Sequence, residues 1–98
     1  MRSHGLRRRD VLKFFNRQFD DAAANLLASL GRAPSFAVTY RFLASCYAHM
    51  GRLDEAREIV ARLRTITPLV VPSELPWRKP EDRELFLSGL RLAAGEAG

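Results

Sequence analysis

Apolar residues recur at spacings of three and four in five stretches of the chain, with polar residues filling the positions between them. This spacing is typical of amphipathic helices. The apolar stripe of the second stretch includes Leu27, and that of the third starts at Phe36. The pattern predicts an all-α fold with five helices, at about residues 6–17, 20–31, 36–50, 53–65 and 81–94.

Residues with known terminal preferences place the ends of these helices. Gly31, Gly51 and Gly95 follow apolar stripes, where glycine adopts the left-handed backbone that ends a helix. Ser35 is placed to cap the third helix through its hydroxyl. Pro80 is placed as the first residue of the last helix, where its missing N–H costs nothing.

The segment 68–80 breaks the helical pattern, because four prolines fall there at intervals of four residues. It is too apolar for a free linker, so we expect an extended strap that lies on the helices, with Trp77 packed against them. The termini, residues 1–5 and 95–98, are expected to be disordered. The apolar residues of the strap are Leu69, Val70, Val71, Leu75 and Trp77.

The chain nearly repeats itself at an offset of 34 residues. The segment 19–22, Phe-Asp-Asp-Ala, returns at 53–56 as Leu-Asp-Glu-Ala, and Pro34 returns as Pro68. A fixed period of this length predicts helix–turn–helix units. Such units bury their apolar faces against each other.

Within the second unit, aromatic, small, glycine and proline residues stand in the order of a tetratricopeptide repeat, which residues 37–68 resemble. The preceding unit departs from the pattern in its first helix and carries Arg17 where the turn glycine is expected. The resemblance implies about one and a half to two repeats over residues 6–67, followed by the strap and a capping helix at 81–94. The residues that carry it are Tyr40, Leu43, Ala44, Tyr47, Gly51, Ala56, Val60 and Pro68.

The order of segments over residues 14–94 also resembles the C-terminal tail of bacterial class III adenylate-cyclase-like proteins. The resemblance rests on the runs 39–56, 78–84 and 87–91. It concerns the tail alone, because the metal-binding aspartates of such cyclases stand on strands that this sequence does not offer. No catalytic residue is carried over.

Charge, hydrophobicity and cysteine content argue against nucleic-acid-binding, membrane-spanning and disulfide-bonded classes of protein. Residues 1–17 hold six basic residues and one acidic residue, which accounts for the whole net charge of +5. The Arg7–Arg9 run lacks the interleaved aromatic residues that stack on bases, so a solvated helix face is favoured over a nucleic-acid site. No apolar run could span a bilayer. A single cysteine, Cys46, favours a reducing cytoplasm.

Arg41, Ser45 and His49 lie four residues apart and therefore share one face of the third helix. The tetratricopeptide resemblance implies that this face lines a concave groove, with Phe42 as an apolar neighbour. One interpretation is a site for an acidic partner segment, which Arg41→Glu would abolish without loss of helicity. The other is a solvated face.

Cys46 and His49 could both touch one metal ion, but zinc needs three or four ligands and the other histidine is the distant His4. We therefore expect no metal and no cofactor. No nucleophile–base set or phosphate loop is present, so an enzyme is not expected. The prediction is a protein–protein interaction module. Two alternatives stay open: a homodimer formed through residues 1–17, and a remnant of a cyclase-type signalling protein.

Overall fold

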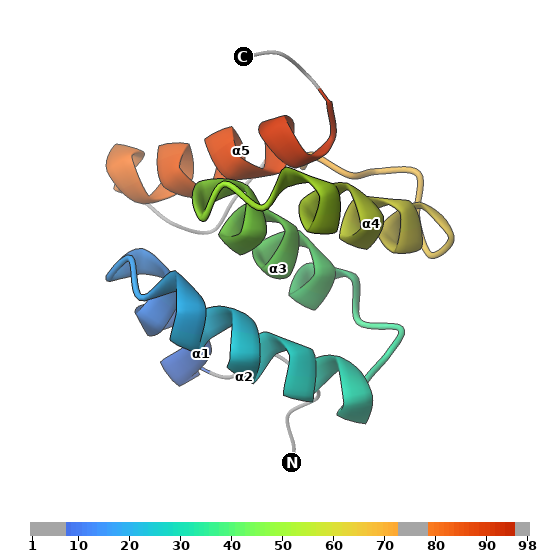
Figure 1. The fold of residues 1–98 in the computed structure, drawn as a ribbon, viewed down its shortest axis with the longest axis horizontal. Helices are drawn as coiled ribbons and strands as arrows, with labels where there is room; N and C mark the ends of the chain where they lie inside the picture. The colour runs from blue at the N-terminus through green and yellow to red at the C-terminus, as the bar shows by residue number, and fades with distance from the viewer. Residues whose placement is uncertain (1–7, 73–78, 96–98) are drawn as a thin grey trace.

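The computed structural model describes residues 8–72 and 79–95, and these residues form helices without any strand. The all-α prediction is confirmed, and each helix begins and ends within about two residues of its expected bounds. Residues 1–5 and 96–98, with Leu75 and Trp77, lie outside the described residues, so the expectations for them stay predictions. The helices are α1 (Arg8–Phe15), α2 (Phe19–Arg32), α3 (Ala37–His49), α4 (Leu53–Arg64) and α5 (Pro80–Ala93) (Figure 1).

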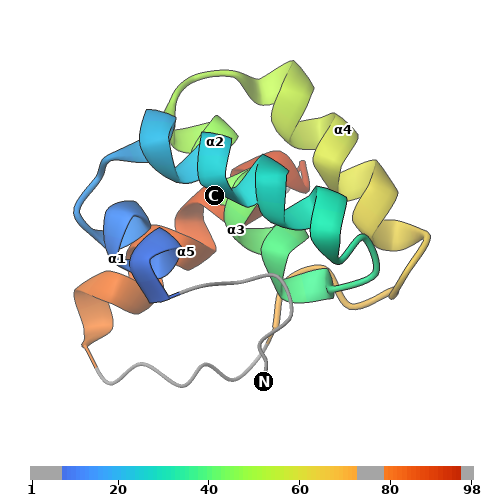
Figure 2. The ribbon, with the colours of Figure 1, turned by 90° about the horizontal axis from the view of Figure 1, so that it is seen from below.

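The helices form two hairpins, α1–α2 and α3–α4, with α5 added on the far side from α2 (Figure 1). Helix α3 is the centre of the arrangement, because it packs against α2, α4 and α5. Helix α5 packs mainly on α3 and much less on α4. Seen from below, the first part of α5 appears next to α1, while the rest of α5 runs behind the centre of the bundle (Figure 2).

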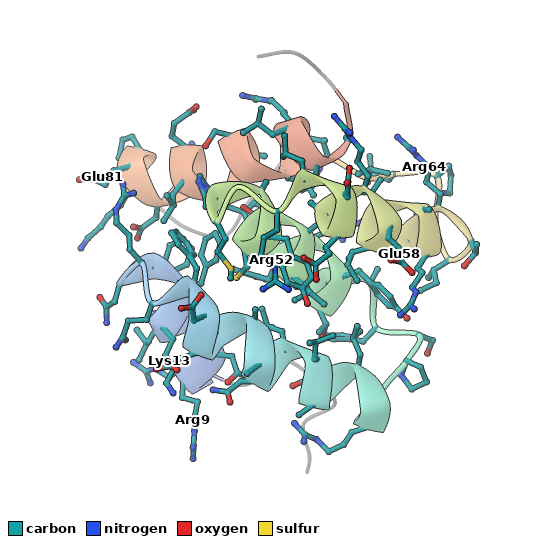
Figure 3. All side chains as sticks on the ribbon, in the orientation of Figure 1. Arg9, Lys13, Arg52, Glu58, Arg64 and Glu81 are labelled. Carbon is teal, nitrogen blue, oxygen red and sulfur yellow. The ribbon has the colours of Figure 1, made fainter. Side chains whose placement is uncertain are left out.

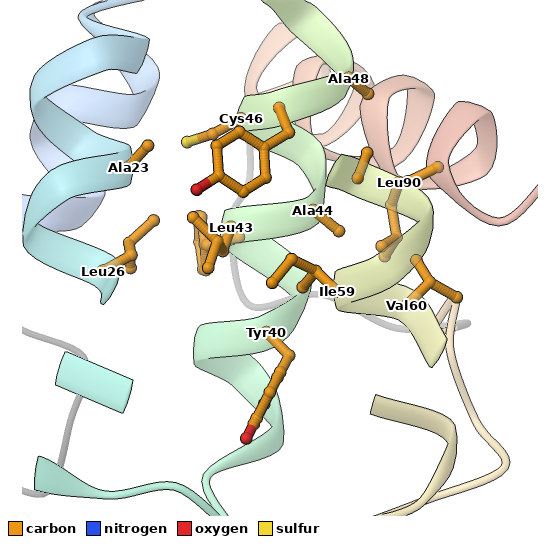
Figure 4. Packing of buried hydrophobic residues seen from close by; sticks show 14 of the residues in the cluster. Ala23, Leu26, Tyr40, Leu43, Ala44, Cys46, Ala48, Ile59, Val60 and Leu90 are labelled. Atoms are coloured by element: carbon orange, nitrogen blue, oxygen red, sulfur yellow. The ribbon is translucent and has the colours of Figure 1, made fainter. Parts of the chain in front are cut away.

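The central position of α3 explains its composition. Residues on every side of it are buried, among them Thr39, Tyr40 and the whole run from Phe42 to Ala48. Leu43 and Cys46 face Ala23 and Leu26 of α2 (Figure 4). Among the repeat-signature residues, the buried ones are Tyr40, Leu43, Ala44, Tyr47, Ala56 and Val60, whereas Gly51 and Pro68 are exposed in the turns that follow α3 and α4.

Both hairpin turns contain a residue with a left-handed backbone, and the two residues are one repeat apart. Gly51 has a φ of 79° and Arg17 a φ of 63°. Arginine therefore adopts the conformation that the second repeat assigns to glycine, at a steric cost of about 1–2 kcal/mol. The first hairpin keeps the turn of the repeat although its residue departs from the pattern.

Replacing Arg17 with glycine is expected to raise the free energy of unfolding by about 0.5–1 kcal/mol, because the steric cost disappears while the unfolded chain gains some entropy. The matched change Gly51→Ala should lower it by about 1 kcal/mol. Urea denaturation followed by circular dichroism measures both. A less stable Arg17→Gly protein would show that the arginine side chain contributes more than its backbone costs.

Four expectations about the helix ends and apolar stripes were wrong. Gly31 lies inside α2, which continues to Arg32, and Ser35 does not cap α3, because Phe36 takes the N-cap position without a side-chain hydrogen bond. Leu27 is 45% exposed and Phe36 37% exposed. Helix α2 packs chiefly against α1 and α3, so its remaining face, with Leu27, meets solvent.

Other terminal predictions are confirmed. Pro80 stands in the first turn of α5, and Gly95 follows that helix with a φ of 84°.

In the described part of the strap, Val70 is buried while Leu69 is 53% exposed. The strap is therefore anchored to the helices at Val70.

Candidate partner-binding groove

The four residues predicted to line a groove lie together on the side of α3 that faces α5 and the strap. Phe42 and Ser45 are fully buried, and Arg41 and His49 are half-buried. The alternative of a solvated face is wrong for Phe42 and Ser45, because α5 packs over this side of α3. Helix α5 therefore contacts Phe42, Ser45 and His49 in this structure.

Two polar side chains of α3 bind the main chain of α5. Ser45 Oγ donates a hydrogen bond to the carbonyl oxygen of Phe86 at 3.0 Å. His49 Nε2 lies 2.6 Å from the carbonyl oxygen of Leu85, which can only accept, so Nε2 carries the hydrogen. Both contacts use groups that any helix would present at this place.

An aromatic cluster joins α5 to both first helices of the hairpins. The ring of Phe86 lies 4.8 Å from that of Phe42 on α3 and 6.3 Å from that of Phe14 on α1. Phe14 and Phe42 are 5.1 Å apart in an edge-to-face arrangement, which is favourable for aromatic pairs. The groove that holds α5 is thus lined by α1 as well as α3.

Phe19 extends the aromatic wall beyond the cluster. Its ring stacks on His49 at 5.0 Å with an interplanar angle of 15°. The role of Phe14 and Phe19 in the groove was not predicted, because the divergent polar positions of the first repeat unit hide its likeness to the second. Their aromatic character at helical spacing was the available signal.

Arg41 is engaged by the strap. Its Nε donates to the carbonyl oxygen of Val70 at 3.1 Å, and its Nη2 to that of Leu69 at 2.7 Å. Partial burial lowers the pKa of Arg41 from its ordinary value. In this arrangement the guanidinium holds the strap beside the groove, and the acidic-partner role remains a prediction.

Charged side chains gather on the outside of the bundle, as Arg9, Arg64 and Glu81 illustrate (Figure 3). Arg52 pairs with Glu55 through two hydrogen bonds, and its guanidinium carbon lies 4.9 Å from the centre of the Tyr47 ring. Shallow hollows at residues 17–21 and 51–55 repeat with the 34-residue period, the first with Met50 at its edge. They mark equivalent hairpin turns.

Cys46 is a buried thiol on the α2 side of α3. Burial raises the pKa of this thiol to about 12. Within residues 8–72 and 79–95 there is no group of three or more histidine, cysteine or carboxylate side chains that could hold a metal ion.

The raised pKa of Cys46 predicts a loss of stability in alkali. Below pH 9 the thiol is neutral in both the folded and the unfolded state. Between the ordinary value of 9.0 and about 12, only the unfolded thiol ionises, so stability falls by up to about 1.4 kcal/mol per pH unit. Urea denaturation at pH 8 and 10.5 should show a steeper loss for the native chain than for Cys46→Ala. An equal loss of stability between pH 8 and 10.5 in the two proteins would contradict the assignment of this loss to Cys46.

A family model of the tetratricopeptide repeat matches residues 16–69 of the chain. No curated protein and no solved structure matches it. None of these comparisons supports the link to adenylate-cyclase-like proteins. The matched segment includes α2, α3 and α4 and ends before α5. Among the helices described, none has the length and apolar character needed to cross a membrane.

Proposed function

We propose, because the chain belongs to the tetratricopeptide repeat family, that it is a non-catalytic protein–protein interaction module whose groove receives an apolar helix of a partner protein. One observation carries the proposal. A helix already lies in this groove, held by Phe42, Ser45 and His49. The same contacts would serve a partner helix that takes the place of α5.

The chemistry of the two seams on α3 supports the exchange of α5. Where α3 faces α4, buried apolar residues such as Ala44 and Val60 lie close together (Figure 4). The seam with α5 includes two side-chain hydrogen bonds to main-chain carbonyls, from Ser45 and His49. Interfaces that separate and re-form are more polar than permanent ones.

The tether sets the condition for binding. Helix α5 is joined to α4 by residues 65–79, so it meets its own groove at an effective concentration on the order of millimolar. A partner helix must therefore bind more tightly than the tethered α5 or meet a chain whose strap is loosened. Arg41, through its two bonds to the strap, is the side chain through which loosening would act.

A peptide of residues 79–95 with an amino-terminal fluorophore tests the proposal, with fluorescence anisotropy as the measurement. The intact chain should bind it weakly, because its own α5 competes. The full chain with Leu90→Val, which weakens its own α5 by about 1 kcal/mol, should bind it about fivefold more tightly. Circular dichroism checks that the variant is folded. No binding to either chain at millimolar concentration would refute an exchangeable groove.

A homodimer is the second candidate, favoured by exposed apolar residues on the first hairpin. Leu12 is 52% exposed and Leu27 45% exposed. Burying them against a second copy would extend the core that two repeats leave small. Thermal unfolding at two protein concentrations about a hundredfold apart discriminates, because the midpoint of a dimer rises with concentration. A constant midpoint would exclude the dimer over that range.

A further inference from the structure

Gly89 of α5 lies directly against Ser45 and His49 of α3. A Cβ atom added to it would overlap Ser45 Oγ and would lie 2.8 Å from Nε2 and 2.9 Å from Cδ2 of His49. Any side chain at this position must push α5 away or displace both polar side chains. Glycine costs about 1 kcal/mol inside a helix relative to alanine, and the close crossing explains its presence.

The two neighbours of Gly89 have little freedom to move aside. Ser45 is fully buried and bonded to the carbonyl oxygen of Phe86, three residues before the glycine. His49 is bonded to the carbonyl oxygen of Leu85, four residues before it, and stacked on Phe19. Carbonyls three and four residues earlier lie on the same helix face. The bonds and the missing side chain therefore define a single crossing point.

On either side of Gly89, the apolar face of α5 is buried against the rest of the core. Phe86 enters the aromatic cluster with Phe14 and Phe42. Leu90 is fully buried and Ala93 is 2% exposed. The helix thus presents an aromatic residue, a glycine three positions later, a leucine next and an alanine three positions after that.

We infer that the groove selects partner helices with a glycine at the crossing point and an aromatic residue three positions before it. The inference rests on the proposed function and names its partner class, a helix of another protein with this spacing. Ser45 and His49 hold main-chain carbonyls, which every helix has. The space around Gly89 and the pocket of Phe86 therefore carry the discrimination.

Peptides of residues 79–95 test the inference against the full chain with Leu90→Val, by fluorescence anisotropy. The Gly89→Ala peptide should bind at least about tenfold more weakly than the unchanged peptide, because its Cβ meets two fixed side chains. If the groove did not select for glycine, the Gly89→Ala peptide would bind more tightly than the unchanged peptide. Alanine favours the helix by about 1 kcal/mol, so binding would become about fivefold tighter.

Two controls isolate the crossing point. The Leu92→Ala peptide changes a 44% exposed residue and should bind within about twofold of the unchanged peptide, since it loses no buried contact. In a chain that also carries Ser45→Ala, the tenfold penalty of the Gly89→Ala peptide should shrink to about threefold or less, because the overlapping hydroxyl is gone. An undiminished penalty would overturn the assignment to Ser45 and His49.

The outcomes separate the inference from the proposed function. If the unchanged peptide binds and the Gly89→Ala peptide binds equally or more tightly, the selection for glycine is overturned. The proposed partner-binding groove then still stands. Failure of every peptide to bind overturns both. Sedimentation of the intact chain at about 100 µM should show a monomer, because the tether favours its own α5. A dimer that persists when Leu12 and Leu27 are replaced by polar residues would make α5 of a second copy the occupant and overturn the partner-protein assignment. A dimer that is lost in that variant would be the one formed through the first hairpin.

The cost of a side chain at position 89 can also be measured in the intact chain, without any peptide. Gly89→Ala should lower the folded-to-unfolded ratio at least about tenfold, and less in the Ser45→Ala background. A Gly89→Ala chain that is as stable as the native chain, or more so, would overturn the inference. This measurement does not depend on the folding of the Leu90→Val variant.

Discussion

Replacing Phe42 with alanine is expected to lower the free energy of unfolding by about 3–5 kcal/mol, the range for a fully buried aromatic residue. The side chain is 1% exposed and packs against the rings of Phe14 and Phe86. A domain of this length has a total stability of about 5–15 kcal/mol. The change would therefore remove a substantial part of it and, for a total near the lower end of this range, leave a measurable fraction of the chain unfolded at ambient temperature.

Urea denaturation followed by circular dichroism measures this loss. Phe36→Ala is the matched control, because Phe36 stands just before the same helix and is 37% exposed. It should cost about 1 kcal/mol or less. Equal costs for the two changes would mean that Phe42 is not at the centre of the core.

Replacing Leu90 with alanine should lower the free energy of unfolding by about 2–5 kcal/mol, because the leucine is fully buried where α5 meets the rest of the core. Leu92→Ala, two residues away and 44% exposed, should change it by about 0.5 kcal/mol or less. The pair tests whether α5 belongs to the folded unit although the family match ends before it. Similar effects of the two changes would show a helix that does not pack.

The helical repeat could be predicted because its signals are local. The offset between Pro34 and Pro68 gave the period, and Tyr40, Ala44 and Ala56 stand where two helices must pack. These residues are buried as the spacing requires. The first turn could not be recognised from Arg17, because a left-handed backbone is expected of glycine. The structure shows that Arg17 adopts this conformation despite its steric cost.

The occupant of the groove could not be predicted, because amphipathic spacing identifies an apolar face but not its neighbour. Ser45 and His49 were correctly placed on one face of α3, yet the same donors serve a partner or the chain's own carbonyls. Gly89 was the available signal. A glycine inside a helix points to a close approach, but only the structure identifies Ser45 and His49 as what approaches it.

Hydrogen exchange of the α5 amides in the unmodified chain reports whether α5 leaves the groove while the other helices stay folded. We expect amides of α5 to exchange through a partial opening, with a lower free energy of opening than amides of α3 and α4. Exchange of all three helices with a single free energy, equal to that of global unfolding, would contradict this expectation. The groove would then be a permanent part of the core and closed to any partner.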